Sequence, residues 1–480
     1  MKIYRPGFLL TFLFLFLFLF LFASTSGQNF ILSGYGSGYK NAELKFYSQT
    51  DPVTKRLKPL LNINCDEKGS FSCEIPFYRN KLIFIKTGIY SLHLYITDSS
   101  RYVLHLPDYV AKPGSEELNP FYIETELIPD VVNNQLDVNN LIRVFDSEYN
   151  PVFNQVADYV LKNYKKEEIQ QEISKLDKYL LVNNQPFYND YVKCRLIMLN
   201  LVNSSADQDQ ARAIEFVNKN FNSENEAFLD LAEQMFSGYL TKLSSGQWKD
   251  YFNRAIAMAS FTELKSVILR DGKITNMELA DYVVLMNLNT DYYERNLPGE
   301  NVRKIISLMR LQGETIDTKN MASTVLDKIN STLPGNIPPD FSLFNSDNSL
   351  MGLKDFRGKY LLLGFVRSDN PTSLMELGII NMWYKKYIKD VQIVTILTDS
   401  NFKSGTEACK KRGFGWIFLD GSKRENLEFN YDLKMYPSFI LLDREGKMIA
   451  NPCPFPSESL EFTIEKVLLA DPARSGSENR

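Results

Sequence analysis

The stretch YLLLGFVRSDNPT, residues 360–372, decides how the C-terminal part of this chain folds. Its first residues form an apolar run, which is typical of a strand buried on both faces of a sheet. Asn370 is a favourable N-cap residue and Pro371 fits the first turn of a helix, so we expect a helix from there to about Ile388. A buried strand that leads directly into a helix predicts an α/β domain.

Strands and helices keep alternating after this stretch. Hydrophobic periodicity and turn residues predict the remaining elements of the domain. In chain order these are a strand over 391–397, a helix over 401–412, a strand over 416–420, a strand over 438–442, a hairpin turn over Asp443–Lys447 and a closing helix over 457–470. Pro437 stands directly before the strand at 438–442.

This order resembles the envelope thiol-disulfide reductase and peroxiredoxin-like redoxin branch of the thioredoxin superfamily. The shared features are the strand that enters a helix, the proline directly before a hydrophobic strand, and an Asp-x-x-Gly-Lys hairpin after it. The resemblance covers residues 339–472 and implies an α/β thioredoxin-like fold for them. It also implies that Pro437 is a cis-proline facing the start of the helix.

The family's Cys-x-Pro-Cys motif has no thiols in this chain. The resemblance aligns the motif with Asp369-Asn370-Pro371-Thr372, with Asp369 at the attacking position and Thr372 at the resolving position. Thiol exchange needs a thiolate nucleophile, which neither a carboxylate nor a hydroxyl replaces. We therefore expect the fold without its usual redox activity, and we assign no catalytic residue.

The remaining cysteines and histidines supply no alternative motif. None of the five cysteines has Cys-x-x-Cys spacing, and His93 and His105 are the only histidines. We therefore expect no metal site and no cofactor. Cys65 and Cys73 flank the turn 66–70, where they could pair across a hairpin or remain two unlinked small residues.

The rest of the chain predicts two further domains, so the expected class is multidomain α+β. Residues 28–130 contain short β-branched and aromatic runs between turn clusters, which favours an accessory β-sandwich. Residues 136–331 show helical periodicity, including the runs 226–243 and 248–269, and favour an antiparallel helical domain. The proline-rich segment 332–338 is expected to be the linker to the last domain.

The N-terminus predicts export. Residues 1–27 contain a short basic start, a Phe/Leu run and a zone of small residues, which is the order of a cleaved secretory signal. We expect a periplasmic protein with no membrane span after cleavage, and a disordered tail over 473–480. The net charge of −4 and the absence of dense basic runs argue against nucleic acid as a partner.

Three functions remain open from the sequence. The favoured hypothesis is a redox-inactive protein that binds an extended peptide or envelope protein in the former active-site groove. The resemblance places that groove beside the motif, along Arg367, Ser368, Tyr436 and Pro437. The alternatives are an oxidoreductase that uses Cys194, Cys409 or Cys453, and a structural scaffold whose other domains bind the partner.

Overall fold

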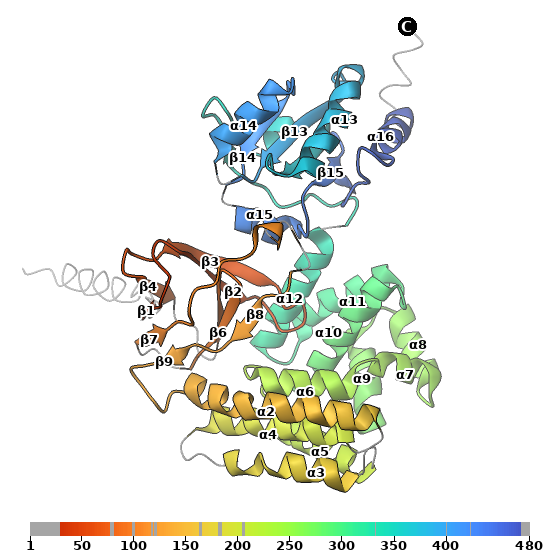
Figure 1. The fold of residues 1–480 in the computed structure, drawn as a ribbon. Coiled ribbons are helices and arrows are strands. Elements are labelled where there is room, and N and C mark those ends of the chain that lie inside the picture. Colours follow the sequence, from red (N-terminus) through yellow and green to blue (C-terminus); the bar gives the residue numbers. More distant parts are fainter. Residues whose placement is uncertain are drawn as a thin grey trace, which may run out of the picture.

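The computed structural model describes residues 29–471 except 77–80, 98–100, 117–118, 120–121, 163–165, 181–184, 204–206, 332, 400 and 423. The expected signal 1–27 and tail 473–480 lie outside the described residues. Figure 1 shows N-terminal strands, a central group of helices, and a C-terminal sheet flanked by helices. The multidomain α+β class is therefore confirmed. Within the described ranges, no helix is long and apolar enough to cross a membrane.

The N-terminal strands form two sheets around one core. Their orders are β4-β1-β7-β9 and β3-β2-β5-β6-β8. In β2 the buried side chains alternate, with Leu44 and Phe46 facing the core, as a half-buried strand requires. The strands are β1 (Asn29–Tyr35), β2 (Glu43–Gln49), β3 (Leu57–Asn64), β4 (Ser70–Pro76), β5 (Lys81–Thr87), β6 (Tyr90–Ile96), β7 (Tyr102–His105), β8 (Thr125–Leu127) and β9 (Asp130–Val131).

The hairpin that would pair Cys65 with Cys73 does not form, so of the two alternatives the structure favours two unlinked residues. The turn itself is present, because the Asp66 carboxylate accepts hydrogen bonds from the amides of Lys68 and Ser70, both at 2.8 Å. However, β3 pairs with β2 and β4 pairs with β1, so the turn crosses from one sheet to the other. Both thiols are free.

The central domain consists of helices packed around one large core. The expected runs 226–243 and 248–269 are each split into two helices, at Gly238 (φ 67°) and at Ala259 (φ 48°). Left-handed residues interrupt the helical hydrogen-bond ladder, which the apolar pattern alone does not reveal. The helices are α2 (Val138–Leu161), α3 (Lys166–Ser174), α4 (Pro186–Asn203), α5 (Asp207–Asn220), α6 (Glu226–Phe236), α7 (Tyr239–Ser245), α8 (Lys249–Ala257), α9 (Phe261–Asp271), α10 (Met277–Glu294), α11 (Gly299–Gln312) and α12 (Ile316–Ser331).

The C-terminal domain has a five-stranded sheet in the order β14-β13-β12-β15-β16. Every residue of the central strand β12 is buried, as its apolar run predicts. Leu362 and Val366 face a core shared with α13, α14 and α16, whereas Leu361 and Leu363 face a core shared with α15. The strands are β12 (Tyr360–Val366), β13 (Val391–Leu397), β14 (Ile417–Asp420), β15 (Ser438–Leu442) and β16 (Met448–Ala450).

The helices of this domain largely match their expected positions. They are α13 (Pro371–Tyr387), α14 (Phe402–Lys411), α15 (Arg424–Tyr431) and α16 (Leu460–Leu469). The closing helix begins three residues later than expected, and α15 has no counterpart among the predicted elements. A short hairpin of β10 (Leu343–Phe344) and β11 (Leu350–Met351) precedes the sheet.

The C-terminal domain rests on the sandwich through α15, which lies beside β3 in Figure 1. The Arg56 guanidinium donates a hydrogen bond to the Phe429 carbonyl and lies 4.1 Å from the centre of the Phe429 ring. The linker is also attached to this domain, because the Gly335 amide donates to the Met448 carbonyl at 2.7 Å. These contacts join segments that are far apart in the sequence.

Candidate functional site

The start of α13 is the place where the family motif would lie. Asn370 is the N-cap residue: its Oδ1 accepts hydrogen bonds from the amides of Thr372 at 2.9 Å and Ser373 at 3.4 Å. Asn370 and Ser373 are buried, with 7% and 0% exposure. In contrast, the Asp369 side chain is 56% exposed.

No contact among the described residues tests the alignment of the motif on Asp369 and Thr372, which stays a prediction. The buried residues Asn370 and Ser373, one position further along, form a second candidate pair with the same three-residue spacing. Neither residue carries a thiol, so the shifted motif 370–373 also lacks redox cysteines.

The proline loop lies against this helix start. The Tyr436-Pro437 peptide bond is cis, as the resemblance implies. The Asn370 side-chain amide donates a hydrogen bond to the Tyr436 carbonyl at 3.0 Å, and the Tyr436 hydroxyl donates to Glu428 of α15 at 2.9 Å. The two segments expected to border the groove are therefore joined by a direct contact.

Two carboxylates hold the loop between β12 and α13. The Arg367 guanidinium donates to both oxygens of Asp369, with its Nε at 2.9 Å from Oδ1. The Ser368 amide and hydroxyl both donate to Asp399, at 3.0 Å and 2.5 Å from Oδ1. Gly405 lies against this pair, because a Cβ there would be 3.0 Å from the Asp399 Cγ. Asp399 was not predicted as a site residue, although its position just after a parallel strand is a usable signal.

A buried carboxylate on α13 ties the helix start to the end of the domain. Glu376 is 1% exposed and accepts hydrogen bonds from the Ser457 amide at 2.9 Å and the Ser457 hydroxyl at 2.6 Å. The sequence analysis did not single out this residue. Its carboxylate thereby pairs the Ser457 amide and hydroxyl before α16 and ties α13 to that segment.

The margin of the site exposes apolar side chains. Met375 on the second turn of α13 is 53% exposed, and Met435 in the proline loop is 43% exposed. Methionine adapts its shape to different partners and is common at binding surfaces that accept varied sequences. The helix start and the proline loop therefore each carry an accessible apolar side chain.

The five cysteines are poor candidates for a relocated redox centre. Burial raises the pKa of Cys409 on α14 and of Cys453 after β16 to about 12 each, and that of Cys73 to about 11. Burial also raises the pKa of Cys65 and of Cys194. A thiol with a raised pKa supplies little thiolate, which is the reactive form.

We expect Cys409 and Cys453 to react slowly in the folded protein. At pH 8, a pKa near 12 leaves a thiolate fraction of about 10⁻⁴, so their modification by an aromatic disulfide reagent should be roughly a hundredfold or more slower than for free cysteine. After denaturation, all five thiols should react. A native thiol that reacts as fast as free cysteine would instead favour the oxidoreductase alternative.

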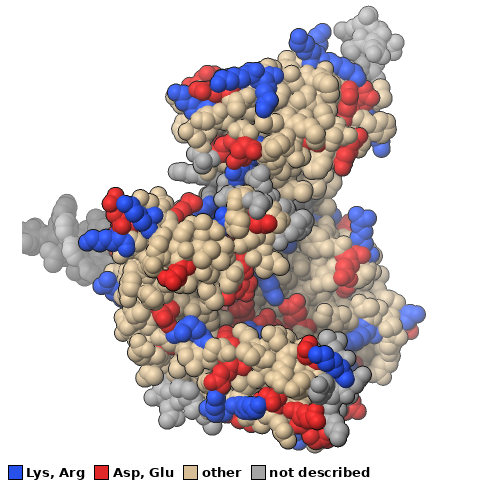
Figure 2. All heavy atoms as spheres, in the orientation of Figure 1, with Lys and Arg blue, Asp and Glu red and all other residues tan. Residues whose placement is uncertain are grey.

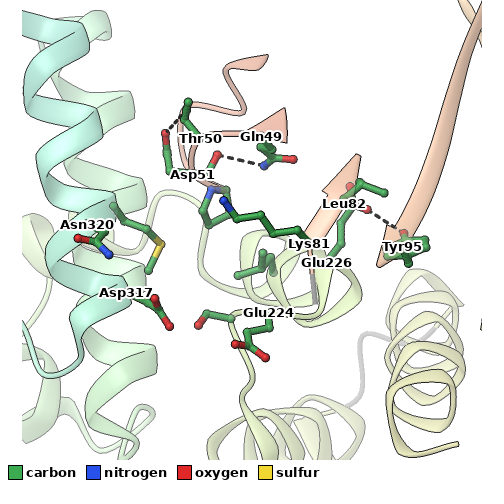
Figure 3. Close-up of a pocket in the computed structure, with 14 residues that line it drawn as sticks. Gln49, Thr50, Asp51, Lys81, Leu82, Tyr95, Glu224, Glu226, Asp317 and Asn320 are labelled. Atoms are coloured by element: carbon green, nitrogen blue, oxygen red, sulfur yellow. Dashed lines mark hydrogen bonds between the residues drawn. The ribbon is translucent and has the colours of Figure 1, made fainter. Parts of the chain in front are cut away.

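A second hollow lies between the sandwich and the helical domain, away from the proline loop. Figure 2 shows acidic side chains gathered in the hollow at the centre of this face. The cavity has a volume of about 300 Å³. Figure 3 shows Lys81 of β5 extending into it, with Glu224 and Asp317 on the side formed by the helical domain. At the wall of the cavity, the Glu226 carboxylate accepts a hydrogen bond from the Tyr95 hydroxyl at 2.9 Å.

Comparison with known proteins agrees with this geometry. Residues 333–457 match the family model described as Redoxin. The C-terminal domain of the chain is therefore a thioredoxin-like redoxin domain. The comparison with curated proteins gave no match.

Similar solved structures cover about the length of this one domain. The thioredoxin domain of a thiol-disulfide oxidoreductase from Bacteroides vulgatus is 23% identical, with a TM-score of 0.26, over 28% of this chain and 99% of that chain. A thiol-disulfide oxidoreductase from Bacteroides fragilis is 24% identical, with a TM-score of 0.25, over 28% and 99%. A thiol:disulfide interchange protein from Bacteroides sp. is 24% identical, with a TM-score of 0.26, over 28% and 90%.

Proposed function

We propose that this chain is an exported, redox-inactive redoxin that binds an extended peptide or protein segment at the former active site. The observation that carries the proposal is the contact between Asn370 and the Tyr436 carbonyl, which joins the helix start to the proline loop. The site thus keeps the paired segments of a thioredoxin-like fold, while neither the aligned positions Asp369 and Thr372 nor the buried pair Asn370 and Ser373 carries a thiol.

The chemistry of the margin supports peptide binding rather than catalysis. Arg367 and Asp369 neutralise each other, and Ser368 is bound to Asp399, so these side chains are held in place by hydrogen bonds. No thiolate nucleophile is available here, and the cysteines elsewhere have raised pKa values. The exposed Met375 and Met435 offer apolar contact on both sides of the site.

Export is part of the same proposal. It rests on the order of basic, apolar and small residues over 1–27. A partner in the cell envelope, reached in the periplasm after signal cleavage, follows from that localisation.

A peptide-binding experiment tests the site. Linear peptides are selected from a random phage-displayed library on the full chain, and their Kd values are measured by fluorescence anisotropy. We expect Met435→Lys to raise these Kd values roughly tenfold or more, because burying an ammonium against the peptide costs about 1.4 kcal/mol or more. The matched control is Met382→Lys on α13, since Met382 is 77% exposed and lies beyond the helix start.

The two variants separate this proposal from the scaffold alternative. Peptides that bind both variants as tightly as the unmodified chain would place their contacts outside the groove and contradict the proposal. Peptides that lose affinity only with Met435→Lys would support it. Insulin reduction should be absent in all three proteins.

A further inference from the structure

Another cavity, of about 340 Å³, lies where the three domains meet. It is enclosed by β2, β3 and β5 of the sandwich, α12 of the helical domain, and α15 with the segment after it. Five basic and two acidic side chains line it, so the lining residues alone carry a formal charge of +3, before the carboxylate partners outside the lining are counted. This excess of positive charge distinguishes it from the acidic hollow described above.

Three of the basic side chains have carboxylate partners. Lys55 pairs with Glu233 at 3.1 Å and Lys86 pairs with Glu124 at 2.7 Å, both outside the lining. Lys434 pairs with Asp432 at 2.8 Å inside it. The second lining carboxylate, Glu428, accepts the hydrogen bond from the Tyr436 hydroxyl.

The other two cations, Arg56 and Lys328, make no ion pair with a described residue. The Arg56 guanidinium instead contacts neutral groups of Phe429: it donates a hydrogen bond to the carbonyl and lies over the ring. The Lys328 ammonium lies 5.4 Å from the centre of the Tyr293 ring. Burial lowers the pKa of Lys328, and Lys434 and Arg56 lower it further, against the opposing effect of Asp432 and Asp51. The cavity therefore brings together positive charges that repel one another.

We propose that this cavity binds a phosphate group. Lysine ammonium groups bind phosphate as point charges, and four of the five cations here are lysines. An anion would offset the repulsion between Lys328, Lys434 and Arg56. The volume exceeds that of inorganic phosphate, so a phosphate ester fits the space. The site connects all three domains and touches the proline loop through Glu428.

The test uses pyrophosphate as the probe. Its binding to the full chain is measured by isothermal titration calorimetry, with the ionic strength held constant by sodium chloride. We expect Lys328→Gln and Lys434→Gln each to raise the Kd roughly tenfold or more, because each removes one cation from the site. The matched control is Lys304→Gln on α11, whose ammonium is exposed and pairs with Glu300. Its Kd should equal that of the unmodified chain.

Lys434 is 74% exposed, so its replacement leaves the fold intact even if Lys328→Gln disturbs α12. Absence of pyrophosphate binding, or equal affinity in all four proteins, would overturn the proposal. Co-sedimentation with phosphatidylglycerol vesicles identifies the source of the phosphate. Vesicle binding that both cavity variants lose assigns a lipid headgroup, whereas pyrophosphate binding without vesicle binding assigns a soluble phosphate ester.

Discussion

Replacing Asn370 and Ser373 together by cysteine should give this protein the disulfide reductase activity that we expect the natural chain to lack. The N-cap position and the residue three places later lie on the same side of the helix start, beside the proline loop. A thiol at a helix N-terminus has a lowered pKa. A pKa near 7 instead of 8.5 raises the thiolate fraction at pH 7 from about 3% to about one half, which is a gain of roughly fifteenfold in the reactive form.

The measurement is the rate of insulin reduction by dithiothreitol with each variant, and the matched control is the double substitution Asp369→Cys and Thr372→Cys. Asp369 is exposed and directed to Arg367, so that pair should form reactive thiols without catalytic turnover. Activity in the control and not in the first variant would support the alignment on residues 369–372. Activity in neither would contradict the assignment of this helix start as the former active site.

The second large effect is expected in the helical domain, where Lys265→Met should lower the free energy of unfolding by about 3–5 kcal/mol. The Lys265 ammonium lies 2.7 Å from the Asp281 carboxylate, whose side chain is completely buried. The other Asp281 oxygen accepts the Glu314 amide at 2.7 Å. Removing the lysine leaves a buried charge without its cation, and this cost exceeds the gain from a new apolar side chain.

Guanidinium unfolding followed by circular dichroism at 222 nm measures this effect, since most helices belong to this domain. Adding Asp281→Asn to Lys265→Met should recover most of the loss, because the amide oxygen still accepts the Glu314 amide. Burial already raises the Asp281 pKa, so the deficit of the single variant should shrink as the pH falls from 7 toward 4 and the carboxylate takes up a proton. A loss below about 1 kcal/mol at pH 7 would show that water compensates the charge.

The framework of the redoxin domain could be predicted from the sequence, whereas several details of its site could not. The apolar run of β12, the capping residues Asn370 and Pro371, and the hairpin at Asp443–Lys447 are encoded within a few residues of chain, and each appears in the structure. The hydrogen bonds at the helix start confirm Asn370 as the N-cap. The alignment of the motif on residues 369–372 stays a prediction.

Contacts between distant segments account for the other differences. Asp399 meets Ser368 because β12 and β13 are adjacent parallel strands, and α15 lies on β3 through Arg56 and Phe429. Cys65 and Cys73 are near in sequence, yet their strands enter different sheets.

Local chemistry in the chain therefore sufficed for the class of each domain and the missing Cys-x-x-Cys pair, and the signal segment stays a prediction. The contact between Asn370 and Tyr436, the partners that hold the loop 367–369 and the cationic cavity between the domains depended on the folded structure. The physical reason is that propensity and capping act over one or two helical turns. Side chains that meet across sheets and domains are selected by packing of the whole molecule.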